Sequence, residues 1–571
     1  MENYKNLKFP EKWSGRHAGS TFTKEFSLDL RGTRDMRGSP RRSAARLKKT
    51  GKLQNNIENR LITVDNIEKK YIIIFFFIFI LNVSLVWLFP YLPTQDGPCH
   101  LYNLTILKDL LNEGKIWGKF YWYNFRLTPN LGFTIFSYPL LNYFSPLVVE
   151  KIFLTSFFLL MVLSVLFFFK TFETPIFPNS FFVFPVLFNF NVFMGFYSYI
   201  ISVPIFLLFL SLIFKFTKRS KIIFFLLFNF FAIIIFFIHL ISCCFLLIST
   251  FVFKYAYRDK NNDSIVKCAA DYIVISFPIL ILIFFYLSSG SSEFENVTYL
   301  FNYKRYIGLY RDLFTFSTAV FFPWHILPAV FLGTSVVIGI YANLKNIFFL
   351  NNRISLLKKV NIYLIVSFLI IYILAPFRFG EGSFFNQRFP WVIFLLSLPF
   401  LNFPDRKLFN IPAIWFARLS ILLSFLFFFS NFYIFYQTNS ILKNYLSGLK
   451  INFPESSVIL PYKRLRPENS SVDFLLHASS YYGFLGKHIV LSNYQAESNL
   501  FQIEFHPKII ELPSQDKINY YPNEIDWSKY PKIDFLLCWN LSLKDVEILN
   551  PFYKKFYEKN EFSIWRRYKT N

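Results

Sequence analysis

An aspartate on a turn offers the clearest chemistry in the sequence. Asp96 lies in PYLPTQDGPCH, directly after a long apolar run, and Pro93 and Gly97-Pro98 interrupt the helix around it. A carboxylate held just beyond an apolar layer is poorly hydrated, which raises its pKa toward the range that suits a general base. Aspartate before glycine is also common turn or helix-capping chemistry, so both interpretations stay open.

A second polar loop, PFRFGEGSFFNQRFPW, separates two later apolar runs. Arg388 leads directly into the second run, where its guanidinium could bind a phosphate through paired hydrogen bonds that lysine cannot form. We expect Arg378 to assist it, and Glu381 and Gln387 are further candidates for lining the site. The alternative is that both arginines only anchor the loop among lipid head groups.

Three histidines complete the set of candidate site residues. His100 follows Asp96 by four residues, while His239 and His325 each stand at the outer end of an apolar run. Each could line the site, although a lone histidine in such a position is more often an ordinary hydrogen-bonded group. Two ligands do not make a metal site. If a divalent metal takes part, Asp96 and Glu381 are the oxygen ligands that we expect.

Polar side chains also gather in two segments near the C-terminus, FLLHASSYYG and VLSNYQAESNLF. They supply His477, Tyr481, Asn493, Tyr494 and Glu497, which could frame a binding cleft. The alternative is a helix and a strand with ordinary polar edges.

The elements that must position these groups are mostly apolar. The 571 residues are 54% hydrophobic and 22% aromatic, which argues against a purely soluble enzyme. Five scattered cysteines exclude a disulfide scaffold or a zinc cluster. The net charge of +25 arises mainly in tails and in short connections between apolar runs. Membrane topology explains this pattern better than a nucleic-acid partner, which we do not expect.

The apolar runs predict a mainly α, polytopic helical membrane protein with about eleven transmembrane helices. The first run, Tyr71 to Pro90, follows Lys69 and Lys70 directly, which places the N-terminus in the cytoplasm. This start makes every basic connecting loop cytoplasmic and leaves the C-terminus outside. The short runs near 181, 240 and 391 could instead be wrongly divided parts of longer runs, or re-entrant segments. The later runs cover about 152–169, 181–194, 199–214, 222–238, 240–254, 270–288, 314–341, 360–375, 391–403 and 411–436.

Three regions follow from this pattern. Residues 1–68 are expected to form a disordered, basic cytoplasmic tail. Residues 69–436 form the transmembrane domain, whose first outer loop, 91–150, carries Asp96. Residues 437–571 are predicted to form a small extracytoplasmic α/β domain. Within it we expect strands at 457–460, 488–491, 533–538 and 562–566, and helices at 471–482 and 543–555.

A chain of this kind, with an acid opening its first outer loop and a terminal extracytoplasmic domain, resembles the GT-C glycosyltransferases. The resemblance covers about 70–436. Asp96 matches the first-loop acid, which in that superfamily acts as base toward the acceptor hydroxyl or helps to bind a metal. Here a single aspartate precedes Gly-Pro-Cys-His, where many members have paired acids. The resemblance implies sugar transfer from a polyprenyl-phosphate donor to a glycan, lipid or protein acceptor on the outer face of a bacterial inner membrane.

The competing class is a non-enzymatic membrane protein, such as a lipid or glycan transporter or an envelope assembly partner. The two classes differ in geometry. A transferase should bring Asp96, Arg388 and the last domain to one outward cavity that also opens sideways to lipid. A transporter should instead show a pathway across the middle of the membrane.

Overall fold

The computed structural model describes residues 68–568, except for 127, 217–219, 259–263, 290–296, 300–302, 350–355, 380–381, 402–412, 452, 464–468, 499–500 and 507–523. The predicted tail therefore lies almost wholly outside the described residues. Contacts group Lys70–Asn571 as one compact unit, and this unit contains the candidate site.

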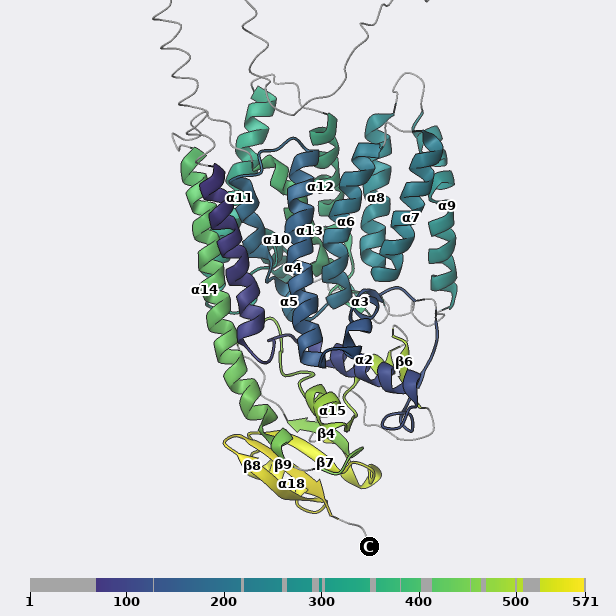
Figure 1. The fold of residues 1–571 in the computed structure, drawn as a ribbon, viewed down its shortest axis with the longest axis vertical. Coiled ribbons are helices and arrows are strands. Elements are labelled where there is room, and N and C mark those ends of the chain that lie inside the picture. Colours follow the sequence, from purple (N-terminus) through teal and green to yellow (C-terminus); the bar gives the residue numbers. More distant parts are fainter. Residues whose placement is uncertain are drawn as a thin grey trace, which may run out of the picture. The chain divides into compact units, whose positions relative to one another are not determined.

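Long apolar helices dominate the unit, which confirms the prediction of a mainly helical chain (Figure 1). Within the described residues, eight helices are long and apolar enough to cross a membrane. Many of their outward side chains are apolar, such as Ile73 on the first helix and Phe284 on α9, which are 69% and 66% exposed. Such faces are compatible with a surrounding membrane. The eight are Glu68–Leu88, α4 (Pro146–Thr171), α6 (Tyr197–Phe216), α7 (Lys221–Ile238), α8 (Leu240–Tyr257), α9 (Ile265–Ser289), α12 (Leu356–Leu374) and α14 (Ala413–Tyr445).

The remaining predicted runs form shorter elements. The run at 181–194 is broken into a 3-10 helix, η2 (Asn179–Val186), and α5 (Phe190–Met194), because Pro185 lies inside it and Asn189 caps a new helix start. The run at 391–403 forms α13 (Phe389–Ser397) followed by η5 (Leu398–Phe400). α10 (Tyr303–Phe314) precedes α11 (Ile326–Phe349), whose apolar part is also short. The number of about eleven crossings therefore stays a prediction.

Helix α2 (Gly97–Asn112) lies across the ends of the long helices (Figure 1). The apolar spacing from His100 to Leu111 predicts an amphipathic helix with its leucine and isoleucine side chains toward the membrane, but most of these side chains are buried in protein. Segments from the C-terminal part of the chain cover them: α15 (Ser480–Gly486) packs against α2, and Gly483 lies directly on the ring of Tyr102. The apolar residues of α2 that are buried in the protein include Leu101, Leu104, Ile106 and Leu107.

A five-stranded sheet occupies the C-terminal part of the chain. Its order is β5 (Ile489–Val490), β4 (Val458–Lys463), β7 (Phe535–Trp539), β9 (Phe562–Arg567), β8 (Tyr553–Lys559). The β4 strand pairs in parallel with β5 and β7, and β9 is antiparallel to β7 and β8.

The elements expected at 437–571 need two corrections. The helix predicted at 471–482 begins only at Ser480, as α15. The helix predicted at 543–555 ends as α18 (Leu543–Leu549), because Pro551 cannot continue it, and strand β8 follows. Helix α14 also runs through the predicted boundary to Tyr445. The separate domain at 437–571 stays a prediction.

The C-terminal part is joined to the first loop by direct contacts. Strand β1 (Tyr121–Tyr123) pairs antiparallel with β6 (Ile503–Phe505). The side chains of Asn103 and Asn493 exchange hydrogen bonds of 2.9 and 3.0 Å. The Tyr102 hydroxyl donates a hydrogen bond of 2.9 Å to the carbonyl of His488. These contacts hold residues 477–495 over the N-terminal half of α2, next to Asp96.

Candidate functional site

A cavity of about 250 Å³ lies beside the start of α2. It brings together residues that are far apart in the sequence. Six of the residues predicted from sequence share this cavity: Asp96, His100, His239, Arg388, His477 and Tyr494. His477 and Tyr494 come from the C-terminal part, and the turn between α5 and α6 adds the segment from Met194 to Tyr199.

The Asp96 side chain does not cap the helix that follows it. Asp96 occupies the N-cap position of α2 but makes no side-chain capping hydrogen bond there. Its Oδ2 instead accepts a hydrogen bond of 3.1 Å from the Tyr494 hydroxyl, and its Oδ1 accepts one of 3.2 Å from Gln95 Nε2. His477 Nε2 lies 3.6 Å from Oδ1. The geometry thus favours a carboxylate turned toward the cavity.

Burial changes the ionisation of the groups in this cavity. Asp96 is only 6% exposed, and loss of hydration raises its pKa to about 7. The hydrogen bonds from Gln95 and Tyr494 and the charge of Arg388 oppose this rise. Burial also lowers the pKa of His100 to about 4, so this ring is neutral at pH 7. Burial raises the pKa of Tyr494 well above its ordinary value, which keeps its hydroxyl protonated as a donor to Asp96.

The turn between α5 and α6 supports the Asp96 backbone. The amide of Asp96 donates to the carbonyl of Met194 at 3.0 Å, and the amide of Gln95 donates to the carbonyl of Phe193 at 2.9 Å. Gly195 ends α5 with a φ of 77°, in the left-handed region that favours glycine. A Cβ added to Gly195 would lie 2.6 Å from the backbone nitrogen of Gly97. The sequence NFNVFMGFYSY thus supports the loop that carries the acid.

Replacing Gly195 with alanine should therefore destabilise the protein. A left-handed backbone costs an L residue about 1–3 kcal/mol, and the new methyl group would also displace the Asp96 loop. The midpoint of thermal unfolding in detergent should fall clearly. The matched control is Gly308→Ala in α10, where no atom lies within 4 Å of the new Cβ. If both variants unfold at the wild-type temperature, the proposed support for the loop is wrong.

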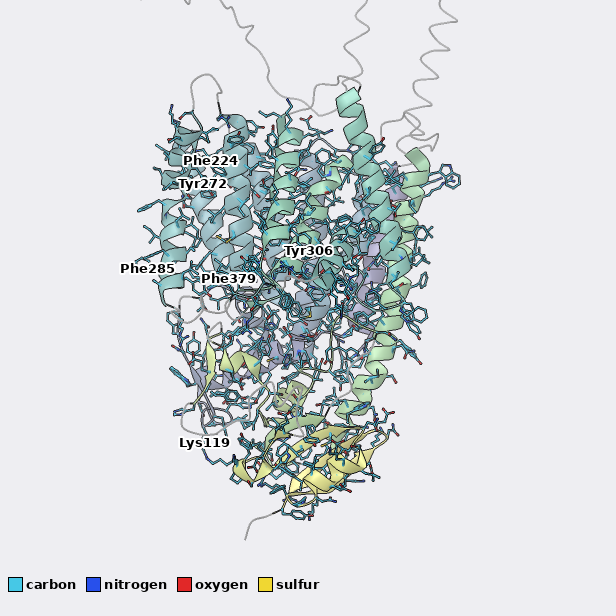
Figure 2. The ribbon with its side chains drawn as sticks, turned by 180° about the vertical axis from the view of Figure 1, so that it is seen from behind. Lys119, Phe224, Tyr272, Phe285, Tyr306 and Phe379 are labelled. Carbon is cyan, nitrogen blue, oxygen red and sulfur yellow. The ribbon has the colours of Figure 1, made fainter. Side chains whose placement is uncertain are left out.

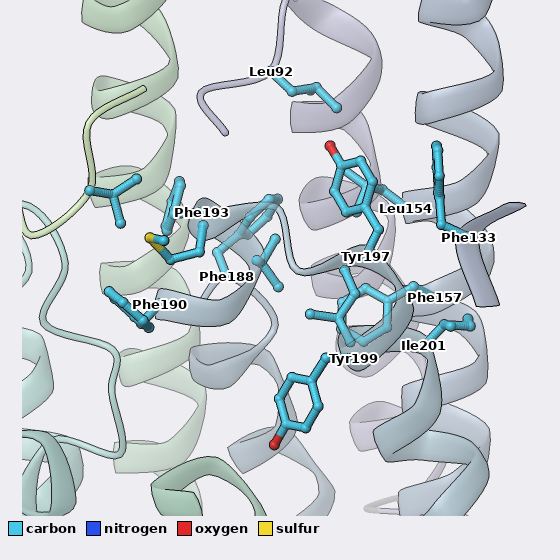
Figure 3. Close-up of a cluster of buried hydrophobic side chains, with 14 of the residues drawn as sticks. Leu92, Phe133, Leu154, Phe157, Phe188, Phe190, Phe193, Tyr197, Tyr199 and Ile201 are labelled. Atoms are coloured by element: carbon cyan, nitrogen blue, oxygen red, sulfur yellow. The ribbon is translucent and has the colours of Figure 1, made fainter. Parts of the chain in front are cut away.

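The side chains of two tyrosines at the start of α6, Tyr197 and Tyr199, point in opposite directions (Figure 3). The Tyr197 hydroxyl donates to the Glu150 carboxylate and lies 3.4 Å from Thr94 Oγ1. The Tyr199 hydroxyl points the other way and donates to the carbonyl of Arg388 at 2.6 Å. Tyr197 thus connects the site to α4, while Tyr199 connects it to the loop before α13.

Glu150 is not among the residues predicted from the sequence. It is a lone acid in the apolar run PLVVEKIFL, and this signal could have identified it, but the predicted span began only at 152. Glu150 is 1% exposed and receives the hydrogen bond of Tyr197, so it positions the ring on which His100 stacks at 5.5 Å. Glu150 does not line the cavity, and we regard it as a positioning residue.

Arg388 presents a cation to the cavity, and the charge of Asp96 acts on it without a direct ion pair between the two described side chains. Its guanidinium lies 4.7 Å from the ring of Phe196 and 5.7 Å from the ring of Tyr199. Within the described ranges, Nε has no hydrogen-bond partner and the side chain forms no ion pair. Burial lowers the pKa of Arg388 to about 10, which leaves it charged at neutral pH. A partly buried, charged donor of this kind at a cavity suits an anionic ligand.

The other predicted residues that the structure describes do not line this cavity. Arg378 lies on β2 (Arg378–Phe379) and is exposed. Gln387 Nε2 instead donates to Asp312 at 3.3 Å. His325 is fully buried, and its Nδ1 lies 3.4 Å from the backbone nitrogens of Val320 and Phe321. Glu381 lies outside the described residues.

Asp96 and Glu381 are the predicted oxygen ligands if a divalent metal takes part. Among the residues with described positions, no group of three or more His, Cys, Asp or Glu side chains could share an ion. Because Glu381 is not among them, we assign no ligand set and no step to a metal.

The chain was also compared with known proteins. No protein-family model matches it, and no curated protein sequence matches it either.

Proposed function

We propose that the protein is an integral-membrane glycosyltransferase that moves a sugar from a polyprenyl-phosphate donor to a glycan, lipid or protein acceptor. One observation carries this proposal: Asp96, with a pKa of about 7, and Arg388, which forms no direct ion pair with a described residue, line the same cavity. A base near neutrality and a phosphate-binding cation are the two groups that such a transfer requires.

In this reaction, Asp96 removes the proton from the acceptor hydroxyl as the hydroxyl oxygen attacks the anomeric carbon. The bond between that carbon and the phosphate oxygen breaks, and its electron pair leaves with the polyprenyl phosphate. Arg388 holds the phosphate and stabilises the negative charge that develops on it. Displacement from the opposite face inverts the anomeric configuration. His477 and Tyr494 come from the C-terminal part and are suited to contact the acceptor.

The proposed setting is a bacterial inner membrane, with the N-terminus in the cytoplasm and the C-terminal part outside. Eight long apolar helices support a membrane setting. The C-terminal sheet and α2 lie at one end of these helices (Figure 1), while the basic Lys221 at the start of α7 is a helix length away from His239, which lines the cavity beside α2. Basic residues prefer the cytoplasmic side, which supports an outward-facing site.

The rate of transfer should depend on pH through Asp96. A general base acts when ionised, so the rate should rise about tenfold per pH unit below pH 7 and become constant above it. Initial rates measured from pH 5 to pH 9 test this. Tyr494→Phe removes a hydrogen bond that favours the ionised carboxylate, so it should move the inflection to higher pH. A flat profile, or one unmoved by Tyr494→Phe, would contradict the assignment.

The function itself is tested by comparing membranes from cells with and without the protein. Lipid-linked and surface glycans are extracted and analysed by mass spectrometry. We expect one specific sugar to disappear from the surface glycans while its polyprenyl-phosphate form accumulates. Unchanged glycans would instead favour a non-enzymatic membrane protein. Purified protein in lipid nanodiscs should then release polyprenyl phosphate from that same donor.

A further inference from the structure

A second cavity, of about 670 Å³, lies between α7, α8 and α9. It is far from the site that contains Asp96. Lys221 at the start of α7 lines it, whereas His239, just after the end of α7, lines the first cavity. The 18 residues of α7 separate the two by about 25 Å. Figure 2 shows Phe224 and Tyr272 near this end of the helices, away from Lys119.

The second cavity concentrates positive charge. Four cationic side chains line it, and Asp271 is the single carboxylate among its lining residues in the described part of the chain. Helices α7 and α9 both begin at this cavity without an acidic residue in their first turns, and helix starts are themselves electropositive. Asp271 offsets part of the repulsion among these groups, and an anion bound between them would offset more of it. The four cations are Lys221, Lys254, Arg258 and Lys267.

The rest of the cavity wall is apolar. Phe224, Phe225 and Phe253 line its interior. Ile222 and Val274 also line it and are 71% and 68% exposed, so the cavity borders the apolar outer face of the helices. A free inorganic anion gains nothing from such a wall. A lipid can place its phosphate among the cations and its chains along the apolar face.

We infer that this cavity binds the phosphate head group of an anionic membrane lipid, with the acyl chains lying against α7 and α9. The inference rests on the proposed membrane setting but not on the proposed transferase activity. By the proposed orientation the lipid belongs to the cytoplasmic leaflet, so it is distinct from a donor bound at Arg388.

Native mass spectrometry of the full chain in detergent tests this inference. The probes are phosphatidylglycerol, zwitterionic phosphatidylcholine and inorganic phosphate. Wild-type protein should retain one phosphatidylglycerol and bind phosphatidylcholine much more weakly. Each basic residue near a bilayer contributes about 1 kcal/mol toward an anionic lipid, so Lys254→Gln/Arg258→Gln should weaken phosphatidylglycerol binding by about thirtyfold. Lys221→Gln/Lys267→Gln should act similarly and provides an independent variant if the first fails to fold.

The matched control is Lys358→Gln/Lys359→Gln at the start of α12, which removes the same charge from residues outside the cavity. It should leave the affinity unchanged. Equal phosphatidylglycerol binding by wild type and both cavity variants would overturn the inference. So would inorganic phosphate that binds alone and displaces the lipid at equal concentration. Asp96→Asn should still bind phosphatidylglycerol, which separates this test from failure of the transferase proposal.

Discussion

Replacing Asp96 with asparagine should lower the rate of sugar transfer by about 10²–10⁴-fold, because general-base catalysis contributes that much to such reactions. Asparagine has nearly the same shape and can still accept the hydrogen bond from the Tyr494 hydroxyl. It cannot take a proton from the acceptor hydroxyl at neutral pH. The measurement is kcat for release of polyprenyl phosphate at pH 8, where the wild-type carboxylate is ionised.

The thermal stability of Asp96→Asn shows whether an inactive variant has misfolded or has only lost the general base. Burial raises the pKa of Asp96 in the folded protein above its value in the unfolded chain. As the pH rises toward 7, the carboxyl group ionises first in the unfolded chain, which lowers the free energy of unfolding of the wild type. Asparagine does not ionise, so the Asp96→Asn variant does not lose this stability. The variant should therefore unfold at pH 8 at or above the wild-type temperature. Glu113→Gln, an exposed change just after α2, is the matched control and should keep full activity. A folded Asp96→Asn protein with wild-type kcat would exclude Asp96 as the base.

Replacing Arg388 with lysine should weaken donor binding by about 10–100-fold, since hydrogen bonds to charged groups contribute about 1.5–3 kcal/mol. Lysine keeps the positive charge but lacks the planar, forked donors that fit a phosphate. It also loses the stacking of the guanidinium on Phe196 and Tyr199. The effect should appear mainly in KM for the polyprenyl-phosphate sugar, and in the Kd for polyprenyl phosphate measured by tryptophan fluorescence.

Arg378→Lys provides the matched control for this experiment. The same loop carries both arginines, but Arg378 is exposed on β2 and does not line the cavity. Donor binding should change by less than about threefold in this variant. Equal loss of affinity in the two variants would mean that the loop acts through its overall charge. Wild-type affinity in Arg388→Lys would remove the phosphate role of Arg388.

The candidate site could be predicted from sequence only where a local signal was present. Asp96 and Arg388 stand out because each is a charged residue at the edge of an apolar run. The same signal also selected Arg378, which the structure places outside the cavity. His477 and Tyr494 come from a polar segment nearly 400 positions away, so their approach to Asp96 depends on how α15 packs against α2.

Hydrophobic content and charge spacing alone predict a mainly helical chain with long apolar helices, because each run of about 20 apolar residues must satisfy its own backbone hydrogen bonds. They also identify the turn that carries Asp96. Only the tertiary structure decides that the apolar face of α2 is covered by protein, that Gly195 supports the Asp96 backbone, and that Glu150 holds Tyr197. These contacts join segments far apart in the chain, and their geometry depends on side-chain packing that no local pattern encodes.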